Sequence, residues 1–338
     1  MSAAATSTDT TASREQTLRE IRDAERFILV THENPDGDAL GSLVGMHNVL
    51  KALGKDSVMF MSADEFPLPY EYRFFDLEGL ASVPPPDVDD RTVIYLDCGN
   101  IDRNPLEIVK RDDTHIVNID HHHDNTRFGT VNWVDDDASC TAELVWCLMR
   151  DLDVEPTITI AEALYVGLVT DTGRFMYENT GARAHVMAAE LIDIGVDVAG
   201  VYKRLYEDMP FAKLELLSRA LAHVERYDDG ALTIARLTRD DFRLAGAEES
   251  YSEGVIDHLR SVAGTKVAAI SRELLAEAAT GRKKVSLRAT DNDIDVSAIA
   301  RAGGGGGHRR AAGFATELSD ADLVQFLREQ IAAQLQLA

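Results

Sequence analysis

Four apolar segments in this chain each end in acidic or imidazole side chains. The first, residues 27–30, has strand length and leads through a polar loop into residues 39–53, whose apolar side chains recur at helical spacing. A strand, a polar loop and a helix in this order are typical of an α/β unit, in which functional groups collect where strands end. We expect an α/β fold with one site formed by these end residues, which are His32, Asp36, Asp38, Asp97, Asp120, His121, His122 and Asp171.

Any one of these segment ends is weak evidence for a site. A single Asp after a strand is more often a turn former or a helix cap, and the run from Asp120 to His123 could be an accidental group of surface histidines. Four recurrences at the same structural position are not explained by turns alone. Imidazole nitrogen and carboxylate oxygen are ligands that hold Mn, Zn or Fe. A closed structural zinc site is disfavoured because such sites are usually rich in cysteine, and only Cys98 lies in these blocks.

The pattern of the chain changes near residue 198, and its 338 residues are enough for two domains that each bury a core. Residues 1–13 are small and polar, so we expect a disordered tail that is neither a secretory signal nor a helix. Residues 14–197 are expected to form a first domain with a largely parallel sheet and flanking helices. A helical connector over 198–225 leads to a smaller α/β domain with a mixed sheet over 226–338.

Five consecutive glycines, residues 303–307, lie inside the second domain, directly before His308, Arg309 and Arg310. Such a run is costly in backbone entropy, so a purely structural role needs a reason. A flexible linker is one interpretation, although a helix end and a strand-like segment flank the run. The interpretation that we favour is that unhindered backbone N–H groups approach a phosphate, with His308 or the arginines supplying charge.

The composition narrows the classes of function. The formal net charge is −24, from 34 basic and 58 acidic residues, so a protein that coats long duplex DNA is not expected. A small anionic substrate at a locally positive metal site is compatible with that charge. No window is apolar enough to span a membrane, which argues against a membrane partner. The cysteines Cys98, Cys140 and Cys147 are odd in number and lack C-x-x-C spacing, which argues for a reducing, cytoplasmic location.

Taken in order, these blocks resemble the DHH phosphoesterase superfamily with its DHH-associated C-terminal domain, over nearly the whole chain. The order and spacing are similar to those of bifunctional oligoribonuclease (nanoRNase)/3′-phosphoadenosine 5′-phosphate (pAp) phosphatases, some of whose relatives hydrolyse cyclic dinucleotides. The resemblance implies a catalytic domain over 14–197, a substrate-binding domain over 226–338 and an active site in the cleft between them. The blocks that carry it are His32-Glu33-Asn34-Pro35-Asp36-Gly37-Asp38, Leu96-Asp97, Ile119-Asp120-His121-His122, Thr170-Asp171-Thr172-Gly173-Arg174-Phe175 and Gly305-Gly306-Gly307-His308.

The resemblance also implies two Mn²⁺ ions, or other divalent metals, and water activated by the two ions as the nucleophile. The implied ligands of one ion are His32 and Asp36. Those of the other are Asp38, His121 and Asp171, and Asp97 is the implied bridge. Asp120 is expected to orient an imidazole, His122 to face the phosphate or the leaving oxygen, and His123 to have no role. The expected substrate contacts are Arg174, Arg288, Gly305, Gly306, Gly307 and His308.

The function implied is hydrolysis of short single-stranded RNA, of pAp, or of a linear or cyclic dinucleotide, to mononucleotides, by a homodimer. Processive degradation of long strands is not expected, because no third domain and no broad basic, aromatic-rich track extend a binding groove. Two alternatives stay open. An inorganic pyrophosphatase or exopolyphosphatase of the same superfamily is disfavoured by the glycine-rich loop. A catalytically inactive nucleotide sensor is disfavoured because every expected ligand position is filled.

Overall fold

The computed structural model describes residues 3–75, 77, 79–111, 113–276, 279–290, 293–307 and 309–335, with the backbone alone for residues 3–10. The chain divides into two compact units, Met1–Asp208 and Met209–Ala338, which we call unit 1 and unit 2. The boundary falls inside the connector expected over 198–225. That segment contains α6 (Val198–Tyr202) and the π-helical turn η6 (Lys203–Glu207) in unit 1, and α7 (Phe211–Ala222) in unit 2.

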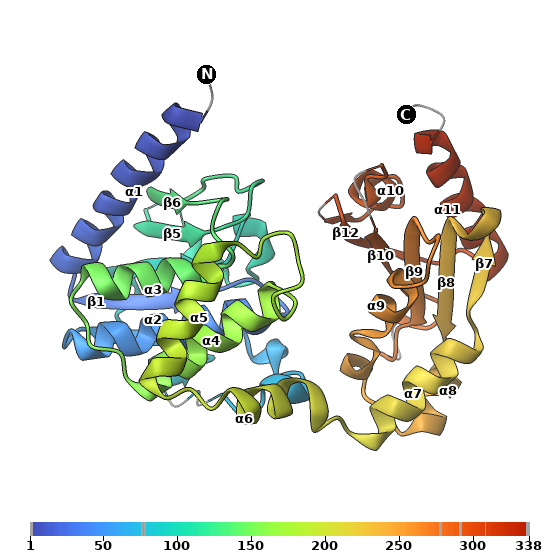
Figure 1. The fold of residues 1–338 in the computed structure, drawn as a ribbon, viewed down its shortest axis with the longest axis horizontal. Coiled ribbons are helices and arrows are strands. Elements are labelled where there is room, and N and C mark those ends of the chain that lie inside the picture. Colours follow the sequence, from blue (N-terminus) through green and yellow to red (C-terminus); the bar gives the residue numbers. More distant parts are fainter. Residues whose placement is uncertain are drawn as a thin grey trace. The chain divides into compact units, whose positions relative to one another are not determined.

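Unit 1 is built on a parallel sheet, as the sequence predicts (Figure 1). The order across the sheet is β3-β2-β1-β4-β5-β6, and every neighbouring pair is parallel. The direction of strand order reverses between β1 and β4, which is the switch point of a doubly wound sheet. The strands are β1 (Arg26–Val30), β2 (Asp56–Phe60), β3 (Leu80–Ala81), β4 (Thr92–Leu96), β5 (Ile116–Asp120) and β6 (Val131–Val134).

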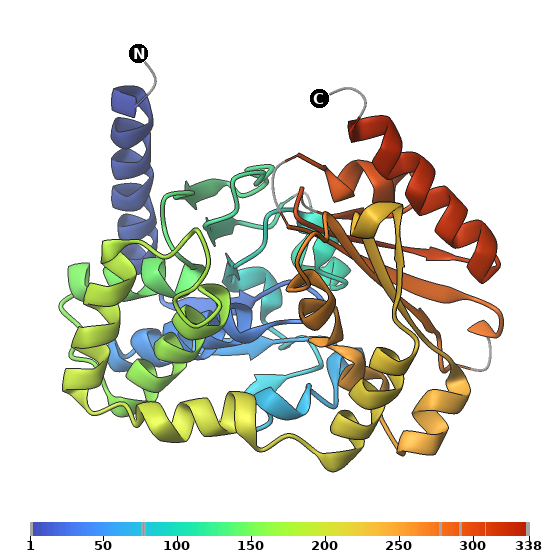
Figure 2. The ribbon, with the colours of Figure 1, turned by 45° about the vertical axis from the view of Figure 1, so that its right-hand side comes forward.

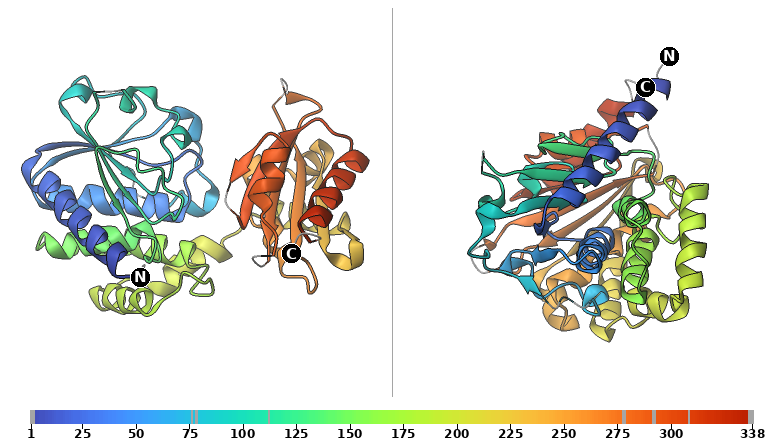
Figure 3. Two further views of the ribbon diagram at one scale, coloured as in Figure 1. Left: turned by 90° about the horizontal axis from the view of Figure 1, so that it is seen from above. Right: turned by 90° about the vertical axis from the view of Figure 1, so that its left-hand side faces the viewer.

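Side chains along the sheet alternate between two apolar cores, as the pleat of a strand requires. On β1, Phe27 and Leu29 face the long helices, whereas Ile28 and Val30 face the opposite side. The helices of the larger core are α1 (Ala3–Asp23), α2 (Gly37–Ala52), α3 (Thr141–Asp151), α4 (Ile158–Asp171) and α5 (Ala182–Ile194). The opposite side is covered by short turns around η3 (Val88–Asp90), η4 (Ile101–Arg103) and η5 (Glu107–Val109) (Figure 3).

Helix α1 begins earlier than the sequence analysis expected. A disordered tail was expected over residues 1–13, yet the chain is helical from Ala3 onward. Residues 3–13 contain neither glycine nor proline and are rich in alanine, the best helix former. Nothing in the segment therefore ends the helix that Leu18 and Ile21 anchor in the core of unit 1.

Helices α2 and α4 approach each other closely because glycines lie at their contact. A Cβ atom on Gly41 would lie 2.4 Å from the carbonyl oxygen of Ala163, and one on Gly167 would lie 2.8 Å from Oδ1 of Asp38. A larger side chain at either position would force the helices apart. The contact brings the first turn of α2, which contains Asp38, close to the end of α4 at Asp171.

Unit 2 contains a mixed sheet of order β11-β12-β10-β9-β8-β7, which confirms the predicted class of the second domain. Only the β8–β9 pair is parallel among the pairs in the described part of this sheet. The strands are β7 (Glu225–Tyr227), β8 (Leu232–Leu237), β9 (Val267–Glu273), β10 (Lys283–Ala289), β11 (Gly306–Gly307) and β12 (Ala311–Thr316). Helices α10 (Val296–Ala302) and α11 (Asp320–Leu335) cover the face that carries the apolar core (Figure 2). Unit 2 also contains α7, α8 (Arg239–Ala245) and α9 (Val255–Arg260).

The sequence analysis missed the shortest elements. It did not predict β3, β6, β7 or β11, which have two to four residues each, nor α8, which has seven. Such lengths hold too few repeats for a periodic pattern to stand out. Among the described residues, no helix is both long enough and apolar enough to cross a membrane.

Candidate metal centre

The predicted ligands meet at the carboxyl ends of three neighbouring strands. His32 lies just after β1, Asp97 directly follows β4, and Asp120 is the last residue of β5, with His121 next along the chain. Strands β1 and β4 are neighbours at the switch point, and β5 pairs with β4. Ligand-binding groups of open α/β sheets collect at this place, so the topology brings together residues that are far apart in the sequence.

Asp97 presents its two carboxylate oxygens to histidines from different strands. Its Oδ2 lies 3.6 Å from Nε2 of His32, and its Oδ1 lies 3.6 Å from Nε2 of His121. The backbone of Asp97 has a φ of +57°, in the left-handed region that Asp and Asn enter more readily than other side chains. Thr141, at the start of α3, donates from Oγ1 to Oδ1 of Asp97 at 3.1 Å.

Asp36 and Asp38 are held at the start of α2. The Oδ1 atom of Asp36 caps the helix by accepting from the backbone N–H groups of Asp38 and Ala39 at 3.0 and 3.1 Å. Asp38 is buried, and its two oxygens accept from the backbone N–H groups of Thr141 and Ala142 at 2.7 and 2.9 Å. The first turn of α3 therefore fixes the carboxylate of Asp38.

Asp171 brings a fourth segment to the cluster. Its Oδ2 lies 3.6 Å from Nε2 of His121. The amide of Asn179 donates to the same Oδ2 at 3.0 Å and to the carbonyl oxygen of Ser139 at 2.7 Å. Asn179 therefore joins the end of α4 to the loop before α3 and orients the carboxylate of Asp171.

All six predicted metal ligands fall into groups that could hold an ion. The ligand atoms within each group lie within 4.8 Å of one another. Two of the groups match the predicted sets, because Asp97 joins His32 and Asp36 in one, and His121 joins Asp38 and Asp171 in the other. A third group contains Asp97, His121 and His122. The grouping confirms that these residues are brought together, and their individual roles as ligands remain a prediction.

The separations between the ligand atoms suit a shared divalent cation better than direct hydrogen bonds between the side chains. The 3.6 Å separations are longer than a hydrogen bond, whereas two atoms that each lie about 2.0–2.2 Å from one ion are separated by about 3–4 Å. The Nδ1–H group of His32 donates to the carbonyl oxygen of Glu33 at 2.7 Å, so Nε2 is the ring nitrogen that faces Asp97. A backbone acceptor of this kind is the usual partner of a metal-bound histidine.

The charges at the site also indicate a place for cations. Burial, together with the charges of Asp97 and Asp171, raises the pKa of Asp38 well above its usual value. Burial raises the pKa of Asp171 to about 7, although His121 opposes the change. Burial disfavours the charged form of Asp97 too, but contact with His32 and the charge of His122 hold its pKa below the usual range. Bound divalent cations would remove this crowding of negative charge.

His122 is held by Asp120. Its Nδ1–H group donates to Oδ1 of Asp120 at 2.7 Å, and the amide of Asn125 donates to the other oxygen of Asp120 at 2.6 Å. Burial lowers the pKa of His122, but the bond to Asp120 and the charge of Asp97 outweigh it and raise the pKa to about 10. The orienting bond predicted for Asp120 is thus present, and its partner is His122. His123 is exposed.

The predicted substrate contacts lie on separate elements. Arg174 is exposed on the turn after α4, and Arg288 is half-buried on β10 in unit 2. Gly305 precedes β11, which consists of Gly306 and Gly307. His308 lies outside the described residues. Each of these contacts remains a prediction.

The glycine run packs against β12, which gives it a structural reason that the sequence analysis did not find. A Cβ atom on Gly305 would lie 2.2 Å from the carbonyl oxygen of Gly313, and one on Gly307 would lie 2.5 Å from Cα of Ala312. Gly306 differs, because nothing lies within 4 Å of its Cβ position. The run is therefore not a flexible linker, and Gly304 shares with Gly306 an open Cβ position.

Sequence reasoning missed three residues that support the centre. Thr141 donates to Asp97, Asn125 to Asp120 and Asn179 to Asp171. A polar side chain that contacts a metal-ligating residue across a turn leaves no periodic pattern in the sequence. Each of these three residues is also of a type that commonly caps helices or forms loops. Their proximity to the ligand blocks in the sequence was the only available signal for Asn125 and Asn179.

We expect Asn179→Ala to weaken Mn²⁺ binding by about 10- to 100-fold, because partners that orient a metal ligand have effects of this size. The loss arises because the carboxylate of Asp171 is no longer held by its donor. Titration of purified protein with Mn²⁺ measures the change. Asn48→Ala is a matched control, because the Asn48 amide donates to the backbone of Val44 within α2 and Asn48 belongs to none of the candidate ligand groups of the described residues. Equal affinities in wild type and Asn179→Ala would contradict the assigned role.

The fold and the cluster together define a two-domain α/β protein with a candidate divalent-metal centre at the sheet's switch point. The chain belongs to the DHH family: the family's N-terminal domain matches residues 26–168, and the DHHA1 domain matches residues 242–336. It is 34% identical over 313 residues to the bifunctional oligoribonuclease and PAP phosphatase NrnA of Thermus thermophilus, covering 90% of this chain and 89% of that protein.

Solved structures agree on the fold. An exopolyphosphatase-related protein from Bacteroides fragilis superposes with a TM-score of 0.83 at 22% identity, over 97% of each chain. RecJ from Thermus thermophilus, solved in complex with Mn²⁺, superposes with a TM-score of 0.52 at 15% identity, over 97% of this chain and 54% of RecJ. At these identities the likeness concerns the architecture alone.

Proposed function

We propose that this protein is a hydrolase that cleaves short RNA oligonucleotides and pAp, and that it does so with divalent metal ions, Mn²⁺ being the ion we favour. The observation that carries the proposal is the gathering of four carboxylates and three histidines in overlapping groups, next to the carboxyl ends of β1, β4 and β5 and the end of α4. The name of the 34% identical relative supports the substrate class. Linear or cyclic dinucleotides belong to the same chemical class and are included in the proposal.

The proposed ligands divide into two sets that share a carboxylate. His32 and Asp36 would hold one ion, Asp38, His121 and Asp171 the other, and Asp97 would contact both. When bound, the ions would supply positive charge that binds phosphoryl oxygens and makes water a better nucleophile near neutral pH. Mixed imidazole and carboxylate ligands suit Mn²⁺, whereas Mg²⁺ is usually held by oxygen ligands.

The chain's own residues position the reacting groups. Asp120 holds the ring of His122 through Nδ1, and Nε2 is the atom proposed to exchange a proton with the phosphate or the leaving oxygen. Thr141 and the first turn of α3 hold Asp97 and Asp38, so these carboxylates do not need to reorganise during the reaction. In unit 2, Arg288, His308 and the backbone of Gly305–Gly307 are the proposed contacts for the terminal phosphate and the nucleotide body.

The size of the substrate follows from charge. A chain with a net charge of −24 repels a long polyanion. A dinucleotide or pAp carries few phosphates, and bound cations offset them locally. The same argument supports action on short oligonucleotides and not on long duplex DNA.

We expect Gly306→Ala to raise KM for a dinucleotide by at least about tenfold while leaving stability unchanged. The open side of Gly306 can accept a methyl group from the rest of the protein, so only a ligand's phosphate would be displaced. Gly305→Ala is the matched contrast, because its methyl group would overlap β12, and overpacking of this kind costs about 1–3 kcal/mol. Steady-state kinetics and urea unfolding measure the two effects. An unaltered KM in a stably folded Gly306→Ala would contradict the approach of a phosphate to this backbone.

The most direct test is turnover of short RNA, pAp, a linear dinucleotide, a cyclic dinucleotide and pyrophosphate side by side with Mn²⁺. Release of mononucleotides, or of AMP from pAp, supports the proposal. Cleavage of pyrophosphate alone would instead indicate a pyrophosphatase, and binding without turnover would indicate a nucleotide sensor.

We also propose that the protein works as a homodimer in the cytoplasm. All three cysteines are free, as a reducing compartment favours. The resemblance to the DHH superfamily supports the dimer, and sedimentation of the purified chain tests it.

A further inference from the structure

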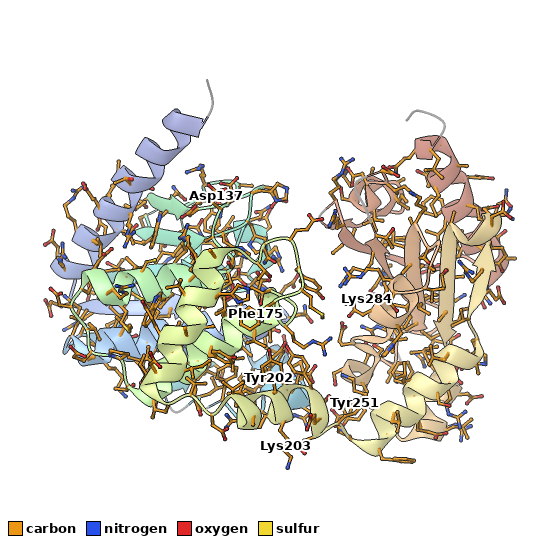
Figure 4. All side chains as sticks on the ribbon, in the orientation of Figure 1. Asp137, Phe175, Tyr202, Lys203, Tyr251 and Lys284 are labelled. Atoms are coloured by element: carbon orange, nitrogen blue, oxygen red, sulfur yellow. The ribbon has the colours of Figure 1, made fainter. Side chains whose placement is uncertain are left out.

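A group of aromatic and basic side chains lies beside the metal centre in unit 1. Arg174 follows Asp171 on the same turn, and its guanidinium carbon lies 5.0 Å from the centre of the Tyr206 ring. The rings of Tyr202 and Tyr206 are 5.6 Å apart. Tyr206 belongs to η6, a π-helical turn, and such turns occur often at functional sites. Figure 4 labels Phe175 and Tyr202 in this part of unit 1.

The backbone that carries Arg174 is strained and tightly held. Gly173, Arg174 and Phe175 have φ values of +53°, +63° and +65°, a region that bulky side chains rarely adopt. The N–H of Arg174 donates to the carbonyl oxygen of Val169 at 2.8 Å, and the ring of Phe175 stacks on His185 at 5.1 Å. Strained conformations persist where their surroundings fix them, and they collect at functional sites. The turn therefore sets the direction of Arg174 independently of a ligand.

Tyr206 is also held by a segment near Asp36. Element η2 (Tyr70–Tyr72) packs against η6, the turn that contains Tyr206. Burial, together with the charge of Asp36, raises the pKa of Tyr72 well above its usual value, so Tyr72 lies near Asp36. The aromatic group thus extends from the Asp171 side of the centre to the Asp36 side.

Arg174 has no carboxylate within ion-pair distance among the described residues, although the chain carries far more acidic than basic side chains. Arg204 provides a contrast. It lies 4.7 Å from the ring of Phe74 in a similar contact, but it also pairs with Glu162 at 3.6 Å. Arg174 is exposed, so it offers a flat cation that is held on one side by a ring and open on the other.

Flat guanidinium groups and aromatic rings are the surfaces on which unpaired RNA bases stack. We propose that Arg174, held against Tyr206, stacks on the base of a nucleotide whose phosphate lies at the metal centre, and that this contact makes the enzyme prefer purines over pyrimidines there. Arg174 is the contacting residue and Tyr206 positions it. The proposal rests on the proposed hydrolysis of short nucleotides.

If Arg174 instead contacted a phosphate, its substitution would lower activity equally on substrates with different bases. A phosphate contact depends on charge and is indifferent to the base, and Lys preserves much of it. Stacking depends on the planar group, which Lys lacks, and on the area of the base. A ratio of the rates on two substrates distinguishes stacking from a phosphate contact, because a general loss of activity affects both rates equally and cancels in the ratio.

The test compares kcat/KM for pApA, pUpU and a dinucleotide with one abasic ribose, all with Mn²⁺ and the full chain. Wild type is expected to favour pApA. We compare the ratio of kcat/KM for pApA to kcat/KM for the abasic dinucleotide. In Arg174→Lys and in Tyr206→Leu this ratio should fall at least about fivefold, because the free energy of stacking on one base corresponds to a factor of this size. The fall should come mainly from a higher KM for pApA. Tyr206→Phe keeps the ring and should retain the wild-type ratio. Arg150→Lys, which alters another arginine near an aromatic ring, at Trp146, is the matched control.

A ratio that is unchanged in Arg174→Lys, with normal wild-type turnover, would overturn the stacking proposal and leave the proposed function intact. An equal fall on all three substrates would also overturn it, because a phosphate contact or a purely structural role acts regardless of the base. If wild type hydrolyses none of the three, the proposed function fails, and the stacking proposal fails with it.

Discussion

Replacing Asp97 with Asn should lower kcat on a dinucleotide on the order of 10³-fold or more, because loss of metal-ion stabilisation removes several kcal/mol from the transition state. Asp97 is the carboxylate that faces histidines from two strands, His32 and His121, so its charge serves both proposed ions. Asn is the informative replacement. It keeps the shape of the side chain and tolerates the left-handed backbone at this position, whereas Ala would add backbone strain to the chemical loss.

Asp137→Asn serves as the matched control for this variant. Asp137 is exposed on the loop before α3 (Figure 4), and it belongs to none of the candidate ligand groups found among the described residues. Circular dichroism should give the same spectrum for both variants and the wild type. Substantial Mn²⁺-dependent turnover by Asp97→Asn would refute the assignment of Asp97 to both ions.

Addition of Mn²⁺ to metal-free protein should raise the unfolding temperature of unit 1 by roughly 5–10 °C. An ion present at 100 times its dissociation constant stabilises the folded state by about 2.7 kcal/mol, and a unit of this size gains about 2–4 °C per kcal/mol. The gain has a local cause, since the buried Asp38 and the partly buried Asp171 both lie close enough to Asp97 for its charge to raise their pKa values. Differential scanning calorimetry before and after chelation measures the change.

The same experiment on Asp97→Asn tests whether the stabilisation comes from this cluster. The shift should shrink to a small fraction of the wild-type value, while Asp137→Asn should keep it in full. A shift of equal size in Asp97→Asn would show that Mn²⁺ binds elsewhere. Mg²⁺ should give a smaller shift at the same concentration, because imidazole is a poorer partner for Mg²⁺ than for Mn²⁺.

The ligand blocks could be predicted from sequence because they lie at the ends of regular apolar segments. Strand β1 and the start of α2 were evident from periodicity, and they place His32, Asp36 and Asp38. That Asp97 lies between His32 and His121 could not be read from spacing, since it depends on the sheet order β1-β4-β5. The resemblance to a known superfamily supplied that step.

Other features of the candidate site depend on three-dimensional contacts that leave no pattern in the local sequence. Asn179 reaches back over one turn to Asp171, and Thr141 reaches Asp97 from a different helix. The structural role of the glycine run was missed for a related reason. The packing of the run against β12 cannot be seen until its register with Gly313 is known, and the proposed phosphate contact is a separate role that stays a prediction.

All six proposed ligands belong to unit 1, within Met1–Asp208. The chemistry and the choice of substrate can therefore change at different rates during evolution. A gene that retains the first unit and exchanges or remodels the second would keep its metal-binding apparatus and acquire a new specificity. The strained turn at Arg174 is the exception, because it would place one proposed determinant of specificity inside the unit that contains the proposed ligands, three residues after Asp171.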